Sequence, residues 1–263
     1  MKLGFIGMGN MAQALCEGFI KSGLIEKSDI SGYAPHYDKL CNNAERIGFI
    51  PEKNIKDMVE NVDCVIMACK PYQIEKVLSQ ISDVLKGKML ISVAAGWSFS
   101  KYEQYVDESV RVQFVMPNTP ALVGEGVMLF EADNSLLPDE RAEVMNLFAS
   151  VGLVEELPAS LMGIGGALTG CGPAFVDLFI EAYADAAVKY GVGRQTAYKL
   201  ISQMILGSAK LQLETGTHPG VLKDNVCSPA GTTIRGVLAL EKAGFRASCA
   251  ECIDAIMEKK VIW

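Results

Sequence analysis

The chain has 263 residues, half of them hydrophobic, and a formal net charge of −7 at pH 7. It is long and apolar enough for one large or two medium-sized domains, but its acidic balance argues against nucleic-acid binding, which needs a basic face. No apolar run reaches the length of a membrane span and the N-terminus does not resemble a cleavable signal peptide, so we expect a cytoplasmic protein without nucleic-acid or membrane partners.

The start of the chain reads as a strand, a glycine turn and a helix. An apolar run at 3–6 is followed by Gly7-x-Gly9-x-x-Ala12 and then by apolar residues at helical spacing. This order is the dinucleotide-binding fingerprint. Gly7 permits the sharp turn, Gly9 lets the backbone approach a pyrophosphate, and the helix start offers free N–H groups. The alternative is a glycine turn that merely begins a βα unit.

Short apolar runs then alternate with helical patterns through the first half of the chain. Alternation of this kind predicts an α/β fold with a mostly parallel, doubly wound, Rossmann-type sheet. We assign residues 1–158 to this dinucleotide-binding domain. Strands are expected at 29–32, 63–69, 89–94, 110–115 and 127–130, and helices at 74–85 and 139–150.

The end of the second strand indicates which nicotinamide cofactor is bound. An Asp or Glu there would bind the 2′-hydroxyl of NAD, whereas a basic residue suits the 2′-phosphate of NADP. The segment 31–36 has neither, but Tyr33, His36 and Lys39 are within reach of such a phosphate. We therefore favour NADP (NADPH) and keep NAD as the alternative, while His36 by itself is more typical of an exposed turn.

Three further loops follow strands, where ligands of open α/β sheets bind. Ala68-Cys69-Lys70-Pro71 places a lysine at such a strand end. Ala94-Ala95-Gly96 is small enough to leave room for a flat nicotinamide, and Met116-Pro-Asn-Thr-Pro120 fixes two polar residues between prolines. Each loop alone is more often structural, but several at successive strand ends indicate a ligand crevice.

The second half of the chain reads as helices only. Helical apolar stripes predict helices at 173–190, 196–214, 232–243 and 245–260, and a glycine-rich segment at 163–173 joins the two halves. We assign residues 159–263 to an all-helical substrate-binding and dimerisation domain. Its wide apolar stripes favour a homodimer or a larger homo-oligomer.

The cysteines and histidines provide little chemistry. Cys249 and Cys252 fit a C-x-x-C pattern, but they lie on an apolar helical stripe with no second Cys/His pair nearby, so we expect core packing rather than a metal site. The chain has only two histidines, His36 and His218. The sequence therefore offers few candidate ligands for a metal site and few histidines for a histidine-centred catalytic site.

The segment Leu222–Thr233 leads into a predicted helix through Ser-Pro-Ala-Gly-Thr-Thr. Successive amides at a glycine-preceded helix start form a nest for a carboxylate. An ordinary capping loop, in which Ser228 or Thr232 caps the helix, is equally compatible with the spacing.

Taken together, these motifs resemble the pyrroline-5-carboxylate reductase family, whose members reduce 1-pyrroline-5-carboxylate to L-proline with NAD(P)H in proline biosynthesis. The resemblance covers nearly the whole chain, and its most specific part is the segment 222–233 continued to Gly244-Phe-Arg246. The chain departs from the family where Ala34, Cys171 and Ala230 replace the usual residues. These departures bear on the NADP preference more than on the reaction.

The resemblance also implies a site shared between two subunits. The Thr233 hydroxyl would face the ring nitrogen as the catalytic group, and the substrate carboxylate would lie on amides at Ser228, Gly231, Thr232 and Thr233 of a partner chain. The implied cofactor-binding residues are Gly7, Met8, Gly9, Asn10, Met11, Ala34, Asn54, Cys69, Lys70, Pro71, Ala95 and Asn225.

The implied chemistry requires no perturbed acid, because the imine nitrogen is basic enough to arrive protonated. Catalysis is then mostly positioning of the substrate against the nicotinamide. Two alternatives remain. A β-hydroxyacid dehydrogenase would need a lysine followed by an asparagine on its long helix, and Lys210 lacks that asparagine. A non-enzymatic nucleotide-binding protein would not need the intact segment 225–233.

Overall fold

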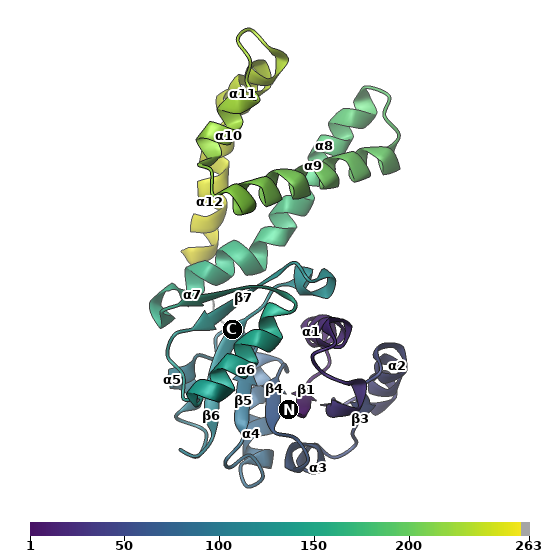
Figure 1. Cartoon of the computed structure of the whole chain (residues 1–263), viewed down its shortest axis with the longest axis vertical. Helices are drawn as coiled ribbons and strands as arrows, with labels where there is room; N and C mark the ends of the chain where they lie inside the picture. Colours follow the sequence, from purple (N-terminus) through teal and green to yellow (C-terminus); the bar gives the residue numbers. More distant parts are fainter. Residues whose placement is uncertain (259–263) are drawn as a thin grey trace. The chain divides into compact units, whose positions relative to one another are not determined.

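The computed structural model describes residues 1–258, which divide into two compact units, Met1–Gly170 and the chain from Cys171 onward (Figure 1). The first unit is α/β and the second is helical, which confirms the predicted fold class. The elements of the first unit are β1 (Leu3–Ile6), α1 (Asn10–Ser22), η1 (Lys27–Asp29), β2 (Ile30–Tyr33), α2 (Tyr37–Ile47), β3 (Ile50–Pro51), α3 (Ile55–Glu60), β4 (Cys64–Met67), η2 (Pro71–Gln73), α4 (Ile74–Ile81), β5 (Met89–Ser92), α5 (Phe99–Tyr102), β6 (Arg111–Met116), η3 (Thr119–Val123), β7 (Gly126–Glu131), α6 (Pro138–Ala149), β8 (Gly152–Leu157) and α7 (Ala159–Gly166).

The first unit is built on one sheet with the strand order β3-β2-β1-β4-β5-β6-β7-β8. Neighbouring strands are parallel except for β6 and β7, which are antiparallel. The order reverses between β1 and β4, because the chain runs outward from β1 to β3 and then returns to continue on the other side. Such a switch point opens a crevice at the carboxyl ends of the strands.

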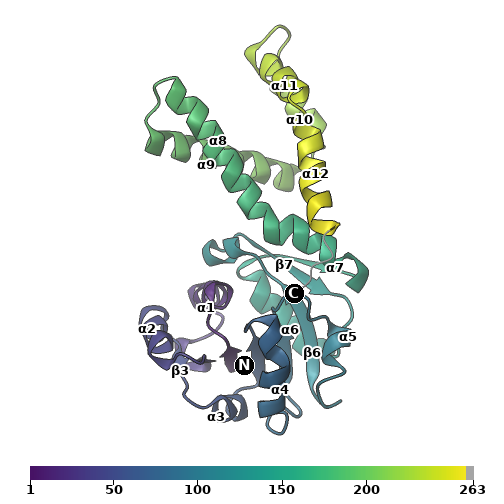
Figure 2. The same cartoon turned by 180° about the vertical axis from the view of Figure 1, so that it is seen from behind.

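Two apolar clusters cover the two faces of this sheet. One contains side chains of α1, α2 and α6, such as Phe19, Leu40 and Phe148, and the other contains side chains of α3, α4 and α5. Helix α6 lies in front of the sheet in Figure 1, and α4 lies in front of it in the reverse view of Figure 2. Because both faces are covered, β1, β4 and β5 are buried along their whole length, as their continuous apolar sequences predict.

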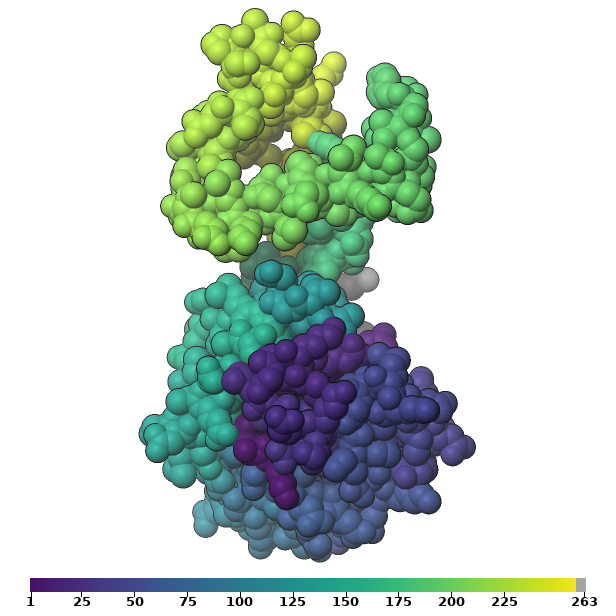
Figure 3. Space-filling model, turned by 45° about the vertical axis from the view of Figure 1, so that its right-hand side comes forward, coloured from purple at the N-terminus to yellow at the C-terminus, as the bar shows by residue number. Residues whose placement is uncertain are grey.

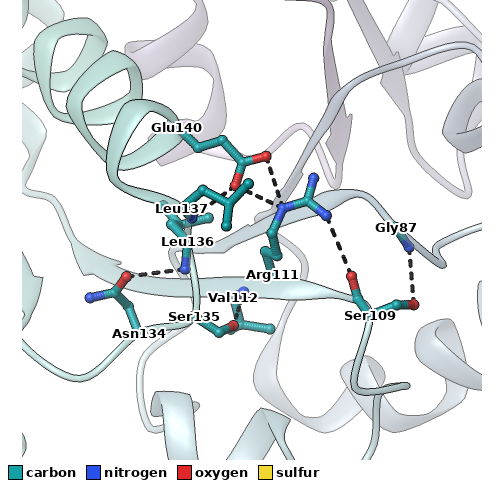
Figure 4. A network of polar contacts seen from close by, with 9 residues as sticks. All are labelled: Gly87, Ser109, Arg111, Val112, Asn134, Ser135, Leu136, Leu137 and Glu140. Atoms are coloured by element: carbon teal, nitrogen blue, oxygen red, sulfur yellow. Dashed lines mark hydrogen bonds and ion pairs between the residues drawn. The ribbon is translucent and has the colours of Figure 1, made fainter.

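A polar network joins β6 to α6 at the far end of the sheet (Figure 4). The Nε of Arg111 donates to both carboxylate oxygens of Glu140, at 2.8 and 2.7 Å, and the Leu137 amide donates to one of them at 3.0 Å. Ser135 Oγ accepts from the Val112 amide at 2.8 Å. The network fixes the start of α6 to the start of β6.

The glycine-rich segment 163–173, predicted to join the two halves, spans the boundary between the two compact units and is helical. It runs through α7, a π-helical turn η4 (Ala167–Cys171) and the start of α8. A Cβ at Gly165 would lie 2.7 Å from side-chain atoms of Leu129 and Leu157, and one at Gly166 would overlap Met116. The glycines therefore let α7 approach the sheet closely.

The continuous helical stretch Ala159–Lys189 corrects one expectation. It is 31 residues long, and an 18-residue window within it reaches a mean hydropathy of 1.4, so by length and composition alone it could cross a membrane. The sequence was predicted to contain no apolar run long enough to span a membrane. Only 11% of the window is buried within the chain.

The second unit consists of helices with little core of their own. Among its described residues, only the apolar side chains of Ala184, Ala197 and Ile201 are buried. Figure 3 shows openings between its helices. Helix α12 contains no buried residue, so the stripe around Cys249 and Cys252 does not form a core within one chain. The helices are α8 (Gly172–Lys189), α9 (Arg194–Thr215), α10 (Pro219–Asn225), α11 (Thr232–Lys242) and α12 (Phe245–Met257); the expected end of α12 at 260 lies outside the described residues.

Candidate active site

A cleft of about 630 Å³ lies at the carboxyl ends of β1, β2, β4 and β5, at the switch point of the sheet. This is the position at which ligands bind open α/β sheets. Its lining residues are Ile6, Gly7, Met8, Gly9, Asn10, Met11, Ala12, Tyr33, Ala34, Pro35, His36, Lys39, Leu40, Asn43, Ala68, Cys69, Lys70, Pro71, Gln73, Val77, Val93, Ala94 and Ala95. All predicted cofactor residues of the first unit except Asn54 are therefore brought together here.

The two glycines of the first turn have different surroundings. Gly7 has φ +94°, and a Cβ added there would lie 2.7 Å from the backbone nitrogen of Cys69. A Cβ added at Gly9 would meet no described atom within 4 Å. The protein thus requires Gly7 for its own fold, whereas Gly9 faces the open cleft.

Helix α1 begins at the floor of this cleft with its first amides uncapped. Gly9 is the N-cap residue and has no side chain that could accept a hydrogen bond from these amides. The first turn of the helix contains no acidic residue. Free amides and the positive end of the helix dipole attract a phosphate group. The residues present therefore fit the pyrophosphate of a dinucleotide.

The electrostatic character of the cleft differs from that of the whole chain. None of the described residues lining it is an Asp or Glu, while Lys39, Lys70 and His36 line it. The chain as a whole has a net charge of −7. A local excess of basic groups in an acidic protein favours an anionic ligand at this place.

Cys69 lines the cleft but is not poised as a nucleophile. Burial raises the pKa of its thiol to about 11, against a smaller lowering by its own backbone. The thiol therefore stays protonated near neutral pH, where only a thiolate would react. Cys69 contributes shape rather than reactivity.

Two predicted positions lie apart from the cleft. The Asn54 side chain accepts a hydrogen bond from the Lys56 amide at 2.9 Å and caps α3, so its place in the cofactor site stays a prediction. Asn118, in the loop after β6, is buried: it donates to the Thr169 carbonyl at 3.0 Å and accepts from the Val127 amide at 2.8 Å. This loop has a structural role.

Asn43 and Gln73 line the cleft but are absent from the sequence-based site. The spacing gives a signal for Asn43, because it follows Lys39 by four residues on helix α2 and therefore shares its face. Gln73 ends η2, and its side chain accepts from the Lys70 amide at 3.2 Å. It supports the Lys70 loop, a role that no sequence motif indicates.

The second group of predicted residues surrounds the start of α11 in the other unit. Gly231 is the N-cap residue, its amide donates to the Ser228 carbonyl at 3.0 Å, and a Cβ on it would lie 2.5 Å from Ser228 Oγ. No side chain caps this helix, so the capping alternative for Ser228 or Thr232 is not what the structure adopts. Thr232 and Thr233 are exposed on its first turn.

Two neighbours of this helix start complete the local geometry. Ala230 has φ +60°, a left-handed conformation that is strained for a residue with a Cβ. Asn225 ends α10 and is exposed. The Gly231 amide is used within this turn, whereas the amides of Thr232 and Thr233 have no hydrogen-bond partner among the described residues, as the nest hypothesis requires.

A glycine turn against an uncapped helix start, in a cleft without acids at a switch point, defines a dinucleotide-binding oxidoreductase of the Rossmann class. Residues 2–96 match the family described as NADP oxidoreductase coenzyme F420-dependent, and residues 159–261 match pyrroline-5-carboxylate reductase dimerisation. The dimerisation match gives the exposed apolar helices of the second unit a reason, because a partner subunit covers such faces.

Full-length comparisons agree with these matches. The pyrroline-5-carboxylate reductase of Escherichia coli is 39% identical over 98% of this chain and 96% of its own length, and that of Treponema pallidum is 38% identical over 98% and 99%. A crystal structure of Plasmodium falciparum pyrroline carboxylate reductase with NADP bound has a TM-score of 0.89 at 33% identity, covering 98% of this chain and 96% of the other. The chain belongs to the pyrroline-5-carboxylate reductase family, as its motifs indicate.

Two different residues mark the boundary between the domains. The dimerisation match begins at residue 159, where the sequence analysis begins its second domain, whereas the compact units divide after Gly170. Helical residues 159–170 lie between the two positions. The division into 1–158 and 159–263 stays a prediction.

Proposed function

We propose that this protein reduces the cyclic imine 1-pyrroline-5-carboxylate to L-proline with NADPH, as a step of proline biosynthesis. Family membership over 98% of the chain is the observation that carries this function. The cleft at the switch point supports it, since its glycine turn and uncapped helix suit a dinucleotide. Membership also decides against the β-hydroxyacid dehydrogenase alternative.

The cofactor would lie along the cleft in the direction that the fold sets. Its pyrophosphate would bind the amides at Gly9 to Met11, and the adenosine half would extend toward the end of β2. There, Lys39 and His36 would face the 2′-phosphate, which no acidic lining residue repels. The nicotinamide half would reach the loops after β4 and β5, at Cys69, Lys70, Pro71 and Ala95.

The substrate would be held by the start of α11. The amides of Thr232 and Thr233, presented by the turn at Gly231, would bind its carboxylate together with the Ser228 and Thr232 hydroxyls, and the Thr233 hydroxyl would accept from the protonated ring nitrogen. Asn225 would approach the nicotinamide. We propose that this helix start is provided by the partner subunit of a homodimer, consistent with the dimerisation match and the exposed faces of the second unit.

The chain's residues act mainly by positioning. The chemistry that NADPH would supply when bound is a hydride for the imine carbon, and the already protonated nitrogen would take up the electron pair of the C=N bond. Thr233 would hold the ring in one orientation and the nest would fix its acid group. Orientation of this kind is worth several orders of magnitude in rate.

The setting we propose is the cytoplasm, with small-molecule ligands and no nucleic-acid or membrane partner. The apolar stretch 159–189 would then be covered by the twin subunit rather than by lipid.

A direct assay tests the proposal. Purified full-length protein is mixed with NADPH and 1-pyrroline-5-carboxylate, and cofactor oxidation and proline formation are both measured. We expect one proline for each NADPH oxidised. NADPH binding without proline formation would support the non-enzymatic alternative, and failure to bind NADPH would overturn the cofactor assignment as well.

A further inference from the structure

Trp97 joins the two loops that line the β4–β5 side of the cleft. Its side chain is 2% exposed, and its indole Nε1–H donates to the carbonyl oxygen of Pro71 at 3.1 Å. Its own amide lies 3.3 Å from the carbonyl oxygen of Ala94. Pro71 and Ala94 both line the cleft, whereas Trp97 does not.

The aromatic ring of Trp97 is held from several sides. Its ring centroid lies 4.9 Å from that of Tyr102 and 5.3 Å from that of Tyr105. The Lys101 ammonium lies 4.1 Å from the ring centroid, a cation–π contact. A ring fixed in this way has little freedom to move, so the loop that it contacts is fixed with it.

The turn before Trp97 directs the ring beneath the cleft. Gly96 has φ +77°, the left-handed conformation that lets the chain turn after Ala95. Trp97 then enters the apolar cluster on the α3–α5 face together with Ile74 and Leu78 of α4. The same helix α4 follows η2, which begins at Pro71. The indole N–H is therefore a tie between the β4 loop and the β5 loop.

The contacts of Trp97 lie at the part of the cleft that would bind only one half of a dinucleotide. The end of β2 faces the adenosine ribose and the α1 start faces the pyrophosphate, so the loops after β4 and β5 are left for the nicotinamide half. We propose that Trp97 is a positioning residue that fixes these two loops in register for the nicotinamide. This inference rests on the proposed function, because it assumes that the cleft binds NADPH.

The test compares two probes that differ in the nicotinamide half. NADPH occupies the whole cleft, whereas 2′,5′-ADP carries only the adenosine and phosphate part. Trp97→Phe keeps a ring but removes the N–H donor. Ser135→Ala is the control: it removes one part-buried hydrogen bond of the same unit, that from the Val112 amide to Ser135 Oγ at 2.8 Å, and neither residue lines the cleft.

We expect Trp97→Phe to raise the Kd of NADPH about 3- to 10-fold, because the substitution removes one hydrogen bond that holds the loop. The Kd of 2′,5′-ADP should stay within about twofold, and Ser135→Ala should leave the Kd of both probes within about twofold. An equal weakening of both probes, or no change for either, would overturn the inference. Failure of the wild-type protein to bind NADPH would instead contradict the proposed function.

A second measurement does not depend on the variant folding. The chain has two tryptophans, so wild-type protein labelled with 5-fluorotryptophan gives two ¹⁹F signals, which Trp263→Phe assigns. We expect NADPH to shift the Trp97 signal and 2′,5′-ADP to leave it in place. A shift of the same size with both probes would contradict a role limited to the nicotinamide half.

Discussion

The backbone of Gly7 lies directly against the backbone amide of Cys69, so closely that a Cβ at Gly7 would be 2.7 Å from that nitrogen. This contact brings the ends of β1 and β4 together beneath the cleft. Gly7→Ala should lower the free energy of unfolding by about 1 to 3 kcal/mol, because it combines this overlap with a strained φ of +94°. Urea unfolding measures the change. An unaltered midpoint would show that the backbone shifts to accommodate the added Cβ without loss of stability.

Gly9 should respond in the opposite way. Gly9→Asp places an acceptable N-cap residue in open space, so the melting temperature should not fall. The added carboxylate would face the pyrophosphate, so NADPH affinity should drop at least about 10-fold. Calorimetric titration with NADPH tests this, and Gly9→Ala separates the effect of size from that of charge. Retained affinity in Gly9→Asp would place the pyrophosphate elsewhere.

Lys39 is the residue that we expect to select NADPH over NADH. Lys39→Ala should raise the KM for NADPH about 10-fold and leave that for NADH nearly unchanged, since one charge-assisted contact to the 2′-phosphate is lost. Lys53→Ala is the control, because Lys53 stacks on Tyr37 of the same helix without lining the cleft. Equal effects of Lys39→Ala on both cofactors would remove Lys39 from the selection.

The Arg111–Glu140 pair predicts an acid-dependent part of the stability. Partial burial favours the neutral carboxyl, but hydrogen bonds from Arg111 and from the Leu137 amide outweigh it and lower the pKa of Glu140 below its ordinary 4.5. A lowered pKa gives stability that is present above the ordinary value and is lost as the pH falls through the lowered one. Glu140→Gln should therefore cost about 1 kcal/mol at pH 7 and less in acid.

Unfolding curves from pH 7 down to about pH 3 measure this difference. Glu143→Gln, on the same helix, is the control and should change little, because its side chain is 54% exposed and loses only a 3.9 Å ion pair with the N-terminal ammonium. A cost for Glu140→Gln that stays constant across this range would contradict the assigned pKa shift.

Thr233 should affect turnover without affecting cofactor binding. Thr233→Ala should lower kcat/KM for the pyrroline about 10- to 100-fold, because the ring loses its orienting hydroxyl. Thr233→Ser keeps the hydroxyl and should retain most of the activity. Thr196→Ala, on the first turn of α9, serves as the control. The role would be withdrawn if Thr233→Ala were as active as the control.

Strands that are buried on both faces were predictable, because their sequences are continuous apolar runs. β4 is a continuous apolar run buried on both faces, so pattern alone located it. β3 has two residues, one of them a proline, and β8, the strand at one end of the sheet order, carries two consecutive glutamates and has no buried residue. Neither shows a buried run, and both are formed by pairing with a neighbouring strand.

Glycines are hard to interpret from sequence, because glycine has two different uses. In the segment 163–173, Gly165 and Gly166 allow close packing of α7 against Leu129 and Met116. At Gly7 the same residue type serves a turn. Only the surrounding structure distinguishes the two, just as only the fold showed that Asn54 caps α3.

The central claim is that the nucleotide cleft of one chain and the α11 start of its twin act on one pyrroline. Mixing subunits tests it: Gly9→Asp and Thr233→Ala chains are produced together with different tags and the mixed dimers are purified through both. In such a dimer one of the two sites combines intact parts only if the parts come from different chains. We predict that the mixed dimer recovers about half of the wild-type rate of NADPH-dependent proline formation. A mixed dimer no more active than the average of its two parents would contradict the claim.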